Sequence, residues 1–335
     1  MKEVTKAMIL AAGFGTRLRP LTDTIPKPLI PYNGKPMIEN AISKLVSAGV
    51  NEFIINTHHH ADKMAEYFES RKGPEHVTLV RENEILGTGG ALLNASEYLE
   101  NSGSFFLYNA DVDTDADLLK MKEYHLLKGG LATLALKKRE TSRHLIVDCD
   151  MNIIGRTEKD SDVLYRQSNV HAKLGFCGIH LISDRLFEVI FAQQSQNFYA
   201  NIISILHSDV PFFEKLRMMI AKEIEKISSA PYLPMFILNE MHSNPERMQC
   251  NGSVDRNTHF FKTFSELVEK EYEAGRIRKV CPQQLFLSIM GITMFPFLAQ
   301  PMIKMALEID GKSFEQLMQE RAEHASELII RSLQV

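Results

Sequence analysis

The sequence predicts an α/β domain of the Rossmann-like kind over residues 1–185 and an all-α helical domain over residues 186–335. Short β-rich runs alternate with amphipathic helical stretches in the first half, which is typical of a mainly parallel sheet covered on both faces. From Leu186 onward the apolar residues follow helical spacing alone. A βα pattern that becomes purely helical indicates a change of domain.

The elements are expected in the following order. Strands are predicted at 7–10, 52–56, 77–80, 104–109 and 131–136, and helices at 37–48, 60–70 and 90–99. In the second half, helices are predicted at 197–207, 210–227, 260–274, 283–295 and 313–333. The last of these carries a stripe of apolar residues: Phe314, Leu317, Met318, Ala325, Leu328, Ile329 and Leu333.

Composition excludes several classes of protein. The net charge of −4 gives no general attraction to nucleic acid, whose binding favours a basic stripe or patch, so no nucleic-acid partner is expected. The four cysteines form no Cys-x-x-Cys pair and are interpreted as reduced thiols. No signal-peptide pattern is present, and the most apolar window, 285–299, is shorter than a bilayer span. A cytoplasmic protein without a membrane partner is therefore expected.

Residues 11–28 form the most informative segment of the chain. Gly13 and Gly15 follow the first apolar strand and let the backbone lie close to a ligand. Amide groups in such a turn can converge on anionic oxygens, and Arg17 and Lys27 add two cations. Pro26 and the next proline, at position 28, are expected to keep the Lys27 segment extended. The segment predicts a phosphate-binding cradle, although a bare Gly-x-Gly would by itself indicate only a solvated turn.

Two further motifs follow strands of the first half. Glu82 and the glycine-rich run Gly87-Thr88-Gly89 follow the third strand, and the run would equally suit a simple helix entry. Asp111 follows the fourth strand, where a carboxylate can reach a divalent cation that bridges phosphate oxygens. Asp113 and Asp115 are interpreted as turn residues first, and the run at 58–60 of three histidines as a solvated turn. Ligands in such sheets bind beyond the carboxyl ends of the strands.

The string at 13–29 closely resembles the signature of the sugar-1-phosphate nucleotidyltransferases: Gly13-x-Gly15-Thr16-Arg17-Leu18-x-Pro20-Leu21-Thr22, then Pro26-Lys27-Pro28-Leu29. The resemblance implies that Arg17 stabilises a departing pyrophosphate, that Lys27 stabilises the transferring phosphate, and that Asp111 binds Mg²⁺. It also implies a nucleotide-binding set: Ala12, Gly13, Gly15, Thr16, Glu82, Gly87, Thr88 and Gly89.

Weaker resemblances add detail. The segment Thr141-Ser142-Arg143 is similar to the N-acetylmuramate-1-phosphate uridylyltransferase branch, and Glu158-Lys159 to a pair that faces the sugar phosphate in relatives. The family pattern ends near Ser183. The second metal-binding Asp of full-length relatives has no counterpart, so the catalytic domain is expected to be truncated.

Residues 186–335 resemble the C-terminal domain of tetracycline-repressor-type regulators, on these strings: Leu186-Phe187-Glu188-Val189-Ile190-Phe191, Glu271-Tyr272-Glu273-Ala274-Gly275-Arg276-Ile277 and Pro282-Gln283-Gln284-Leu285-Phe286. That resemblance implies a small-molecule effector and a homodimer formed by the last two helices. The chain would then be a chimera of two families.

Two functions follow from these resemblances. The first is transfer of a nucleotidyl group from a nucleoside triphosphate to a sugar 1-phosphate, with release of pyrophosphate. The alternative is a non-catalytic small-molecule-binding dimer derived from a regulator that lacks its DNA-binding domain. The missing second metal-binding carboxylate favours the alternative with respect to turnover, whereas the intact cradle favours nucleotide binding.

Overall fold

The computed structural model describes residues 3–73, 75–158, 161–245 and 253–335. The chain divides into two compact units, Met1–Leu186 and Phe187–Val335, which are described separately. The change from a βα pattern to a helical pattern thus occurs in the sequence where the first unit ends.

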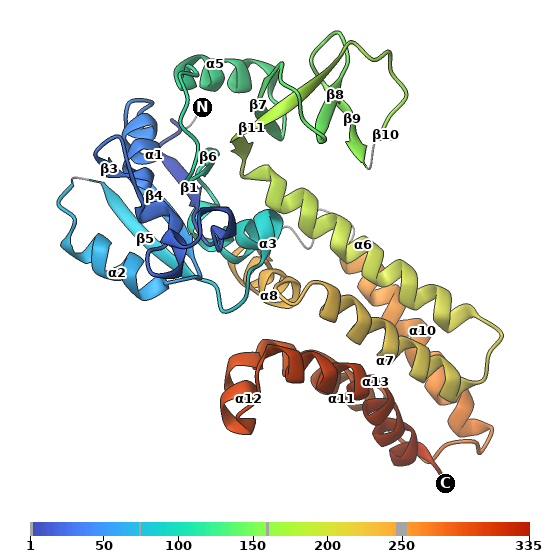
Figure 1. Cartoon of the computed structure of the whole chain (residues 1–335). Helices are drawn as coiled ribbons and strands as arrows, with labels where there is room; N and C mark the ends of the chain where they lie inside the picture. Colours follow the sequence, from blue (N-terminus) through green and yellow to red (C-terminus); the bar gives the residue numbers. More distant parts are fainter. Residues whose placement is uncertain (1–2, 74, 159–160, 246–252) are drawn as a thin grey trace. The chain divides into compact units, whose positions relative to one another are not determined.

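The first unit contains a nine-stranded sheet in the order β10-β9-β8-β11-β6-β1-β4-β5, with β7 also paired to β11 (Figure 1). The strands are β1 (Lys6–Leu10), β4 (Glu52–Thr57), β5 (His76–Arg81), β6 (Ser104–Asn109), β7 (Ala132–Lys137), β8 (His144–Val147), β9 (Ile153–Glu158), β10 (Ser161–Leu164) and β11 (Ala172–Ser183). The five predicted strands are confirmed, with bounds shifted by one residue at most.

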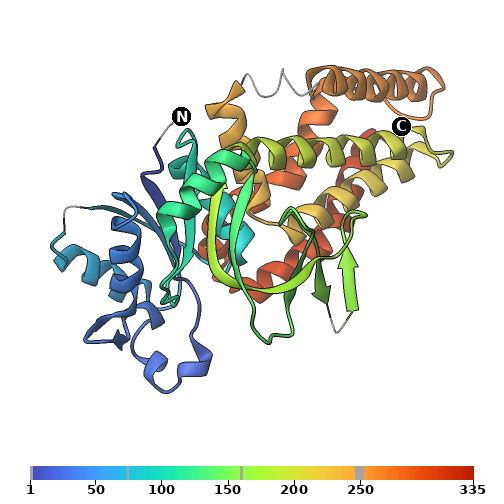
Figure 2. The ribbon, with the colours of Figure 1, turned by 90° about the horizontal axis from the view of Figure 1, so that it is seen from above.

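The expectation of a mainly parallel sheet is wrong for half of it. Strands β6, β1, β4 and β5 are parallel, because a helix crosses over between successive strands. Strand β11 pairs in the antiparallel sense with β6, β7 and β8. Short connections such as the one between β8 and β9 permit only antiparallel pairing. Strand β11, yellow-green in Figure 2, has an irregular register between Phe176 and His180.

Helices pack on this sheet through apolar faces. The helices are α1 (Met37–Val46), α2 (Ala61–Ser70), α3 (Gly87–Asn94), α4 (Ser96–Leu99) and α5 (Leu118–Lys128). Ile38, Ile42 and Leu45 of α1 are buried in one apolar cluster with Ile9 and Phe106 of the sheet. The third predicted helix, at 90–99, begins three residues earlier and is interrupted at Ala95.

The segment between β1 and α1 consists of three 3₁₀ turns and a short hairpin. The turns are η1 (Thr16–Leu18), η2 (Leu21–Asp23) and η3 (Lys27–Leu29), and the hairpin pairs β2 (Pro31–Tyr32) with β3 (Lys35–Pro36). The prediction of an extended Lys27 segment is therefore wrong. Pro26 is extended, but its carbonyl oxygen accepts the Leu29 N–H at 2.9 Å, and the absent N–H of Pro28 costs nothing in the first turn.

In its described residues the second unit consists of helices and the short turns that connect them. Its helices are α6 (Arg185–His207), α7 (Phe212–Ser229), α8 (Leu233–Ser243), α10 (Ser253–Glu273), α11 (Pro282–Leu298), α12 (Gln300–Leu307) and α13 (Gly311–Leu333). The five predicted helices are confirmed, although α6 begins twelve residues before the predicted start at 197. The short helices α8 and α12, each with a proline in its first turn, are additional to the predicted set.

The apolar stripe of α13 mainly closes the core of its own unit. Phe314, Met318, Ala325, Ile329 and Leu333 are buried with residues of α7 and α11. Leu317 and Leu328 are 37% and 51% exposed. Only these two members of the stripe are therefore available to a second chain.

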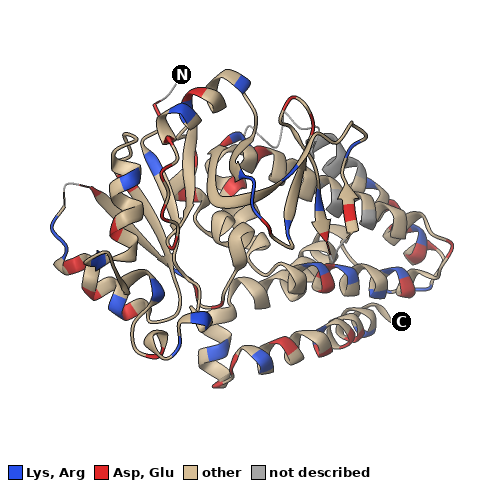
Figure 3. Cartoon of the chain, turned by 45° about the horizontal axis from the view of Figure 1, so that its top comes forward, with Lys and Arg blue, Asp and Glu red and all other residues tan. Residues whose placement is uncertain are grey.

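Charges of both signs are interspersed along the helices of each unit (Figure 3). Among the described residues, no single helix has the length and apolar composition needed to cross a membrane, although the pair Pro282–Leu298 and Gln300–Leu307, bent by 74°, meets those two criteria together.

Candidate functional site

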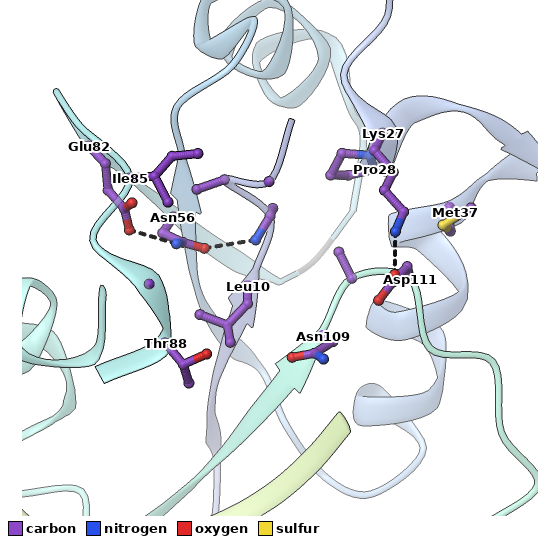
Figure 4. Close-up of a pocket in the computed structure, with 15 residues that line it drawn as sticks. Leu10, Lys27, Pro28, Met37, Asn56, Glu82, Ile85, Thr88, Asn109 and Asp111 are labelled. Carbon is purple, nitrogen blue, oxygen red and sulfur yellow. Dashed lines mark hydrogen bonds and ion pairs between the residues drawn. The ribbon is translucent and has the colours of Figure 1, made fainter. Parts of the chain in front are cut away.

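The site lies where the parallel strands end. Leu10 of β1 is in register with Asn56 of β4 and with Asn109 of β6. Because parallel strands share one carboxyl edge, these three residues lie side by side on it, and all three line one cavity (Figure 4).

Two adjoining cavities open at this edge. The first, of about 270 Å³, is lined by Leu10, Ala11, Ala12, Gly13, Lys27, Pro28, Met37, Asn56, Glu82, Ile85, Gly87, Thr88, Asn109, Ala110 and Asp111. The second, of about 520 Å³, is lined by Gly13, Gly15, Thr16, Arg17, Leu18, Lys27, Met37 and Asp111. Four residues belong to both linings: Gly13, Lys27, Met37 and Asp111. The cavities therefore form one continuous depression, with Lys27 and Asp111 at the junction.

The two glycines of the cradle have different roles. Gly15 has a φ of +63°, and a Cβ there would lie 2.7 Å from Thr22 Cγ2. Thr22 is buried and donates a hydrogen bond to Gly15 O (3.1 Å), so the turn itself requires this glycine. A Cβ on Gly13 would meet no atom within 4 Å. The turn does not require Gly13, which instead leaves a length of bare backbone facing the cavity.

The predicted cations are both at the site. Lys27 Nζ forms an ion pair with the Asp111 carboxylate, so the predicted phosphate ligand and the predicted metal ligand contact each other (Figure 4). Arg17 is exposed in the lining of the second cavity and makes no ion pair with any described residue. A phosphate group at the junction could replace Asp111 as the partner of Lys27.

A buried polar chain lies under the first cavity. Asn56 Oδ1 accepts a hydrogen bond from the Ala11 N–H (2.8 Å), and Asn56 Nδ2 donates to Glu82 Oε1 (2.7 Å). Glu82 Oε2 accepts from the Leu86 N–H (3.1 Å). Asn56 and Glu82 are each 3% exposed. Glu82 thus holds its own loop, rather than extending its carboxylate toward a base.

The turn after β6 is fixed by Tyr108. Burial, with a smaller contribution from Asp113, raises the pKa of Tyr108 to about 12. Its hydroxyl therefore stays protonated and donates to Val112 O (3.2 Å). Gly178 of β11 packs against this turn, because a Cβ there would lie 2.7 Å from Val112 Cγ2. These contacts fix the backbone on either side of Asp111.

The structure places ten of the predicted site residues in the depression: Ala12, Gly13, Gly15, Thr16, Arg17, Lys27, Glu82, Gly87, Thr88 and Asp111. Gly89 is the third residue of α3 and lies outside both linings. Glu158 ends β9, where it pairs with Arg156, and lines neither cavity. Lys159 lies outside the described residues. Asp113 accepts from the Tyr32 hydroxyl (3.2 Å) and Asp115 is exposed, as expected of turn residues.

The histidine run forms a turn, as predicted, but it is half-buried rather than solvated. His58, His59 and His60 are half-buried. Phe14 of the cradle packs edge-on against His58 and His59, at ring-centroid distances of 5.6 and 5.5 Å. His59 Nε2 also lies 3.2 Å from Thr22 O. The run supports the glycine turn, and no cluster of three metal-binding side chains occurs among the residues that the structure describes.

Sequence reasoning missed Asn56, Asn109 and Met37. Asn56 and Asn109 end predicted strands, so their position at the carboxyl edge could have been found by aligning the strand ends. Met37 begins α1 and lines both cavities, and no sequence pattern marks it.

The residues fit a magnesium ion only in part. Asp111 offers a carboxylate and Asn109 a carboxamide oxygen in the same lining. Mg²⁺ prefers oxygen ligands, and it is commonly held by one or two carboxylates together with substrate phosphates. The donor set therefore suits a metal that arrives with a phosphorylated ligand, rather than one held by the protein alone.

The first unit is similar to known nucleotidyltransferases. Residues 6–152 match the family described as nucleotidyl transferase. Mannose-1-phosphate guanylyltransferase 1 of Arabidopsis thaliana is 36% identical over 193 residues, which are 55% of this chain and 52% of that protein. Mannose-1-phosphate guanyltransferase of Saccharomyces cerevisiae is 32% identical over 194 residues, with the same two coverages. The crystal structure of HddC from Yersinia pseudotuberculosis complexed with GMP-PN is 26% identical, with a TM-score of 0.45, over 55% of this chain and 78% of that one.

The chain spans about half the length of the curated relatives that it matches. The resemblance of the first unit to sugar-1-phosphate nucleotidyltransferases is confirmed at the level of the family match and its homologues. The matches do not support the muramate-specific branch, because these relatives are named as mannose-1-phosphate enzymes. The regulator-like second half, the chimera and the truncation stay predictions.

Proposed function

We propose that the protein transfers a nucleotidyl group from a nucleoside triphosphate to a sugar 1-phosphate, with release of pyrophosphate. The observation that carries the proposal is the junction of the two cavities, where Gly13, Lys27 and Asp111 meet at the carboxyl edge of the sheet. The family match over residues 6–152 supports the same reaction.

The proposal gives a task to each part of the depression. The first cavity, lined by Gly87 and Thr88, would take the nucleoside, and the second, lined by Arg17, would take the outer phosphates. Lys27 at the junction would then face the α-phosphate. The sugar phosphate oxygen attacks this phosphorus while the bond to pyrophosphate breaks. Catalysis of such a step requires positioning and charge neutralisation rather than a covalent intermediate.

Arg17 and Lys27 would neutralise negative charge on opposite sides of the breaking bond. Arg17 would bind the pyrophosphate that accumulates charge, while Lys27 neutralises the transferring phosphate. Asp111 would be released from Lys27 as the phosphate replaces it, and its carboxylate would then be free to hold magnesium. A bound Mg²⁺ supplies charge neutralisation on phosphate oxygens.

The nucleobase and the sugar are proposed from the relatives. Several of these are named as mannose-1-phosphate guanylyltransferases, which makes GTP and mannose 1-phosphate the first pair to test. The nucleotidyltransferase assignment does not depend on this choice.

A homodimer formed by the second unit, in the cytoplasm, is part of the proposal. It is supported by Leu317 and Leu328, which lie on the exposed side of the α13 stripe.

The reaction is tested by pyrophosphate release. The protein is incubated with Mg²⁺, GTP or UTP, and one sugar 1-phosphate at a time: mannose, glucose or N-acetylmuramate. We expect release that requires both substrates and that falls sharply in Lys27→Ala. A wild-type protein that releases no pyrophosphate from any pair, and binds neither nucleotide in calorimetry, would contradict the proposal.

A further inference from the structure

We infer that Asn56 is a positioning residue that couples the phosphate cradle to the loop before Gly87, through a chain of hydrogen bonds here named the Asn56–Glu82 relay. The relay consists of three hydrogen bonds. Ala11 N–H to Asn56 Oδ1 and Asn56 Nδ2 to Glu82 Oε1 are drawn as dashed lines in Figure 4, and the third is Leu86 N–H to Glu82 Oε2. The inference rests on the proposed function, because it assigns a role in holding the nucleotide.

The chemistry of the relay permits one arrangement. If the Asn56 carboxamide were flipped, its NH₂ would face the Ala11 N–H and its oxygen would face the Glu82 carboxylate. Both contacts would be repulsive in a site where Asn56 and Glu82 are 3% exposed. The direction of every hydrogen bond in the relay is therefore fixed by its two ends.

The relay joins two segments that are far apart in sequence but line one cavity. Ala11 directly precedes Ala12 and Gly13 of the cradle, while Leu86 directly precedes Gly87 and Thr88 of the other wall. The backbone at Glu82 is held as well, since its N–H donates to Thr57 O (2.7 Å) and its carbonyl oxygen lies 2.9 Å from His58 Nδ1. Asn56 thus sets the spacing between the wall proposed for the nucleoside and the wall proposed for the phosphates.

This spacing matters for a ligand that spans both walls. A nucleoside triphosphate contacts both walls simultaneously. If the cavity is already held at the correct width, less free energy is spent on ordering the two walls when the ligand binds. Inorganic tripolyphosphate needs the cradle alone. Damage to the relay should therefore weaken nucleotide binding more than tripolyphosphate binding, which a general loss of stability would not do.

The experiment is a double-mutant cycle on nearly isosteric changes. Asn56→Asp places two carboxylates in contact, and Glu82→Gln leaves two donors facing each other at either Asn56 or Leu86, whichever way the new carboxamide turns. In the double variant every hydrogen bond is restored: the new carboxylate accepts from Ala11 N–H and from the new carboxamide, whose oxygen accepts from Leu86 N–H. Asn51→Asp is the matched control, because Asn51 is exposed and precedes β4 at the opposite edge.

Calorimetry with GTP, with UTP and with tripolyphosphate supplies the readout, under conditions in which each variant is folded. We expect each single change to weaken binding of the preferred nucleotide roughly tenfold or more, with a much smaller effect on tripolyphosphate, and the double variant to regain most of the loss. Asn51→Asp should bind like the wild type. Unchanged nucleotide affinity in the folded single variants, equal losses for nucleotide and tripolyphosphate, or no recovery in the double variant would each overturn the inference.

A failure of the proposed function can be distinguished from a failure of the inference about Asn56. If the wild type binds neither GTP nor UTP, the coupling is measured by hydrogen exchange of the Ala11 and Leu86 amides. Both amides should lose protection together in Asn56→Asp, and both should regain it in the double variant. Loss at Ala11 alone would overturn the coupling.

Discussion

Two buried carboxyl groups, Glu82 of the α/β unit and Glu223 of the helical unit, have opposite surroundings. In the α/β unit, the buried Asn56 and Glu82 have both ends of their side chains in hydrogen bonds, next to a cavity. In the helical unit, Glu223 of α7 is 6% exposed, and its Oε1 has no hydrogen-bond partner among the described residues. Satisfied polar groups at a sheet edge indicate a built site. A buried carboxyl group in a helical core indicates instead a cost to stability.

The largest expected effect is a loss of activity when Lys27 of the α/β unit is replaced. Lys27→Met removes the charge at the cavity junction and should lower kcat/KM for pyrophosphate release by roughly 10²–10³-fold, the size found when one preorganised charge-stabilising donor is lost. Steady-state kinetics measure it. Lys72→Met, an exposed lysine of the same unit, is the control. Equal activity in the two variants would remove the junction as the centre of the reaction.

The sequence predicted which residues line the depression better than it predicted how the strands pair. The cradle could be predicted because its glycines, cations and prolines lie within one short segment. Asn56 and Glu82 could not be paired from sequence, because their contact depends on the alignment of two strand ends. The antiparallel half of the sheet was missed for a related reason, since strand pairing is non-local. Helix α13 was predicted well, yet its stripe did not tell which members face the unit's own core.

The next effect concerns Glu223 in the helical unit. Burial raises the pKa of Glu223 to about 7, partly offset by a hydrogen bond with Thr293. Between the ordinary pKa of 4.5 and about 7, the folded unit binds a proton that the unfolded chain has released. The unit is therefore most stable below about pH 4.5 with respect to this group, and it loses up to about 3 kcal/mol as the pH rises through the raised pKa.

Glu223→Gln should remove this dependence and should stabilise the unit at pH 8. Native-state hydrogen exchange of the α7 amides at pH 5 and pH 8, corrected for intrinsic rates, measures it in the full chain. Glu225→Gln, on the same helix but exposed, is the control. Parallel pH profiles for wild type and Glu223→Gln would show that the carboxyl group is not the cause.

A smaller effect distinguishes the two glycines of the cradle. Gly15→Ala should destabilise the α/β unit by at least about 1–2 kcal/mol, because a non-glycine residue at φ +63° is strained and its Cβ would contact Thr22. Gly13→Ala should leave the free energy of unfolding nearly unchanged but weaken nucleotide binding, since the new methyl group occupies cavity space. Urea unfolding and GTP calorimetry on both variants measure the difference. Similar effects of the two changes on stability would contradict the distinction.

The smallest effect on stability is expected at Leu328. The sequence stripe offered Leu328 and Ile329 equally as dimer contacts, but Ile329 is 3% exposed and belongs to the core of its own unit. Leu328 is 51% exposed, so Leu328→Asp should change the free energy of unfolding of the monomer by no more than about 0.5 kcal/mol.

The same change should nevertheless separate a dimer that buries this face, because a charge placed in an apolar interface must be desolvated without a partner. Light scattering at micromolar concentration measures the mass. Leu127→Asp makes the matched change at a leucine of the α/β unit that is 84% exposed, and it should leave the mass unchanged. A monomeric wild type, or dissociation by both variants alike, would show that the α13 face does not hold a second copy.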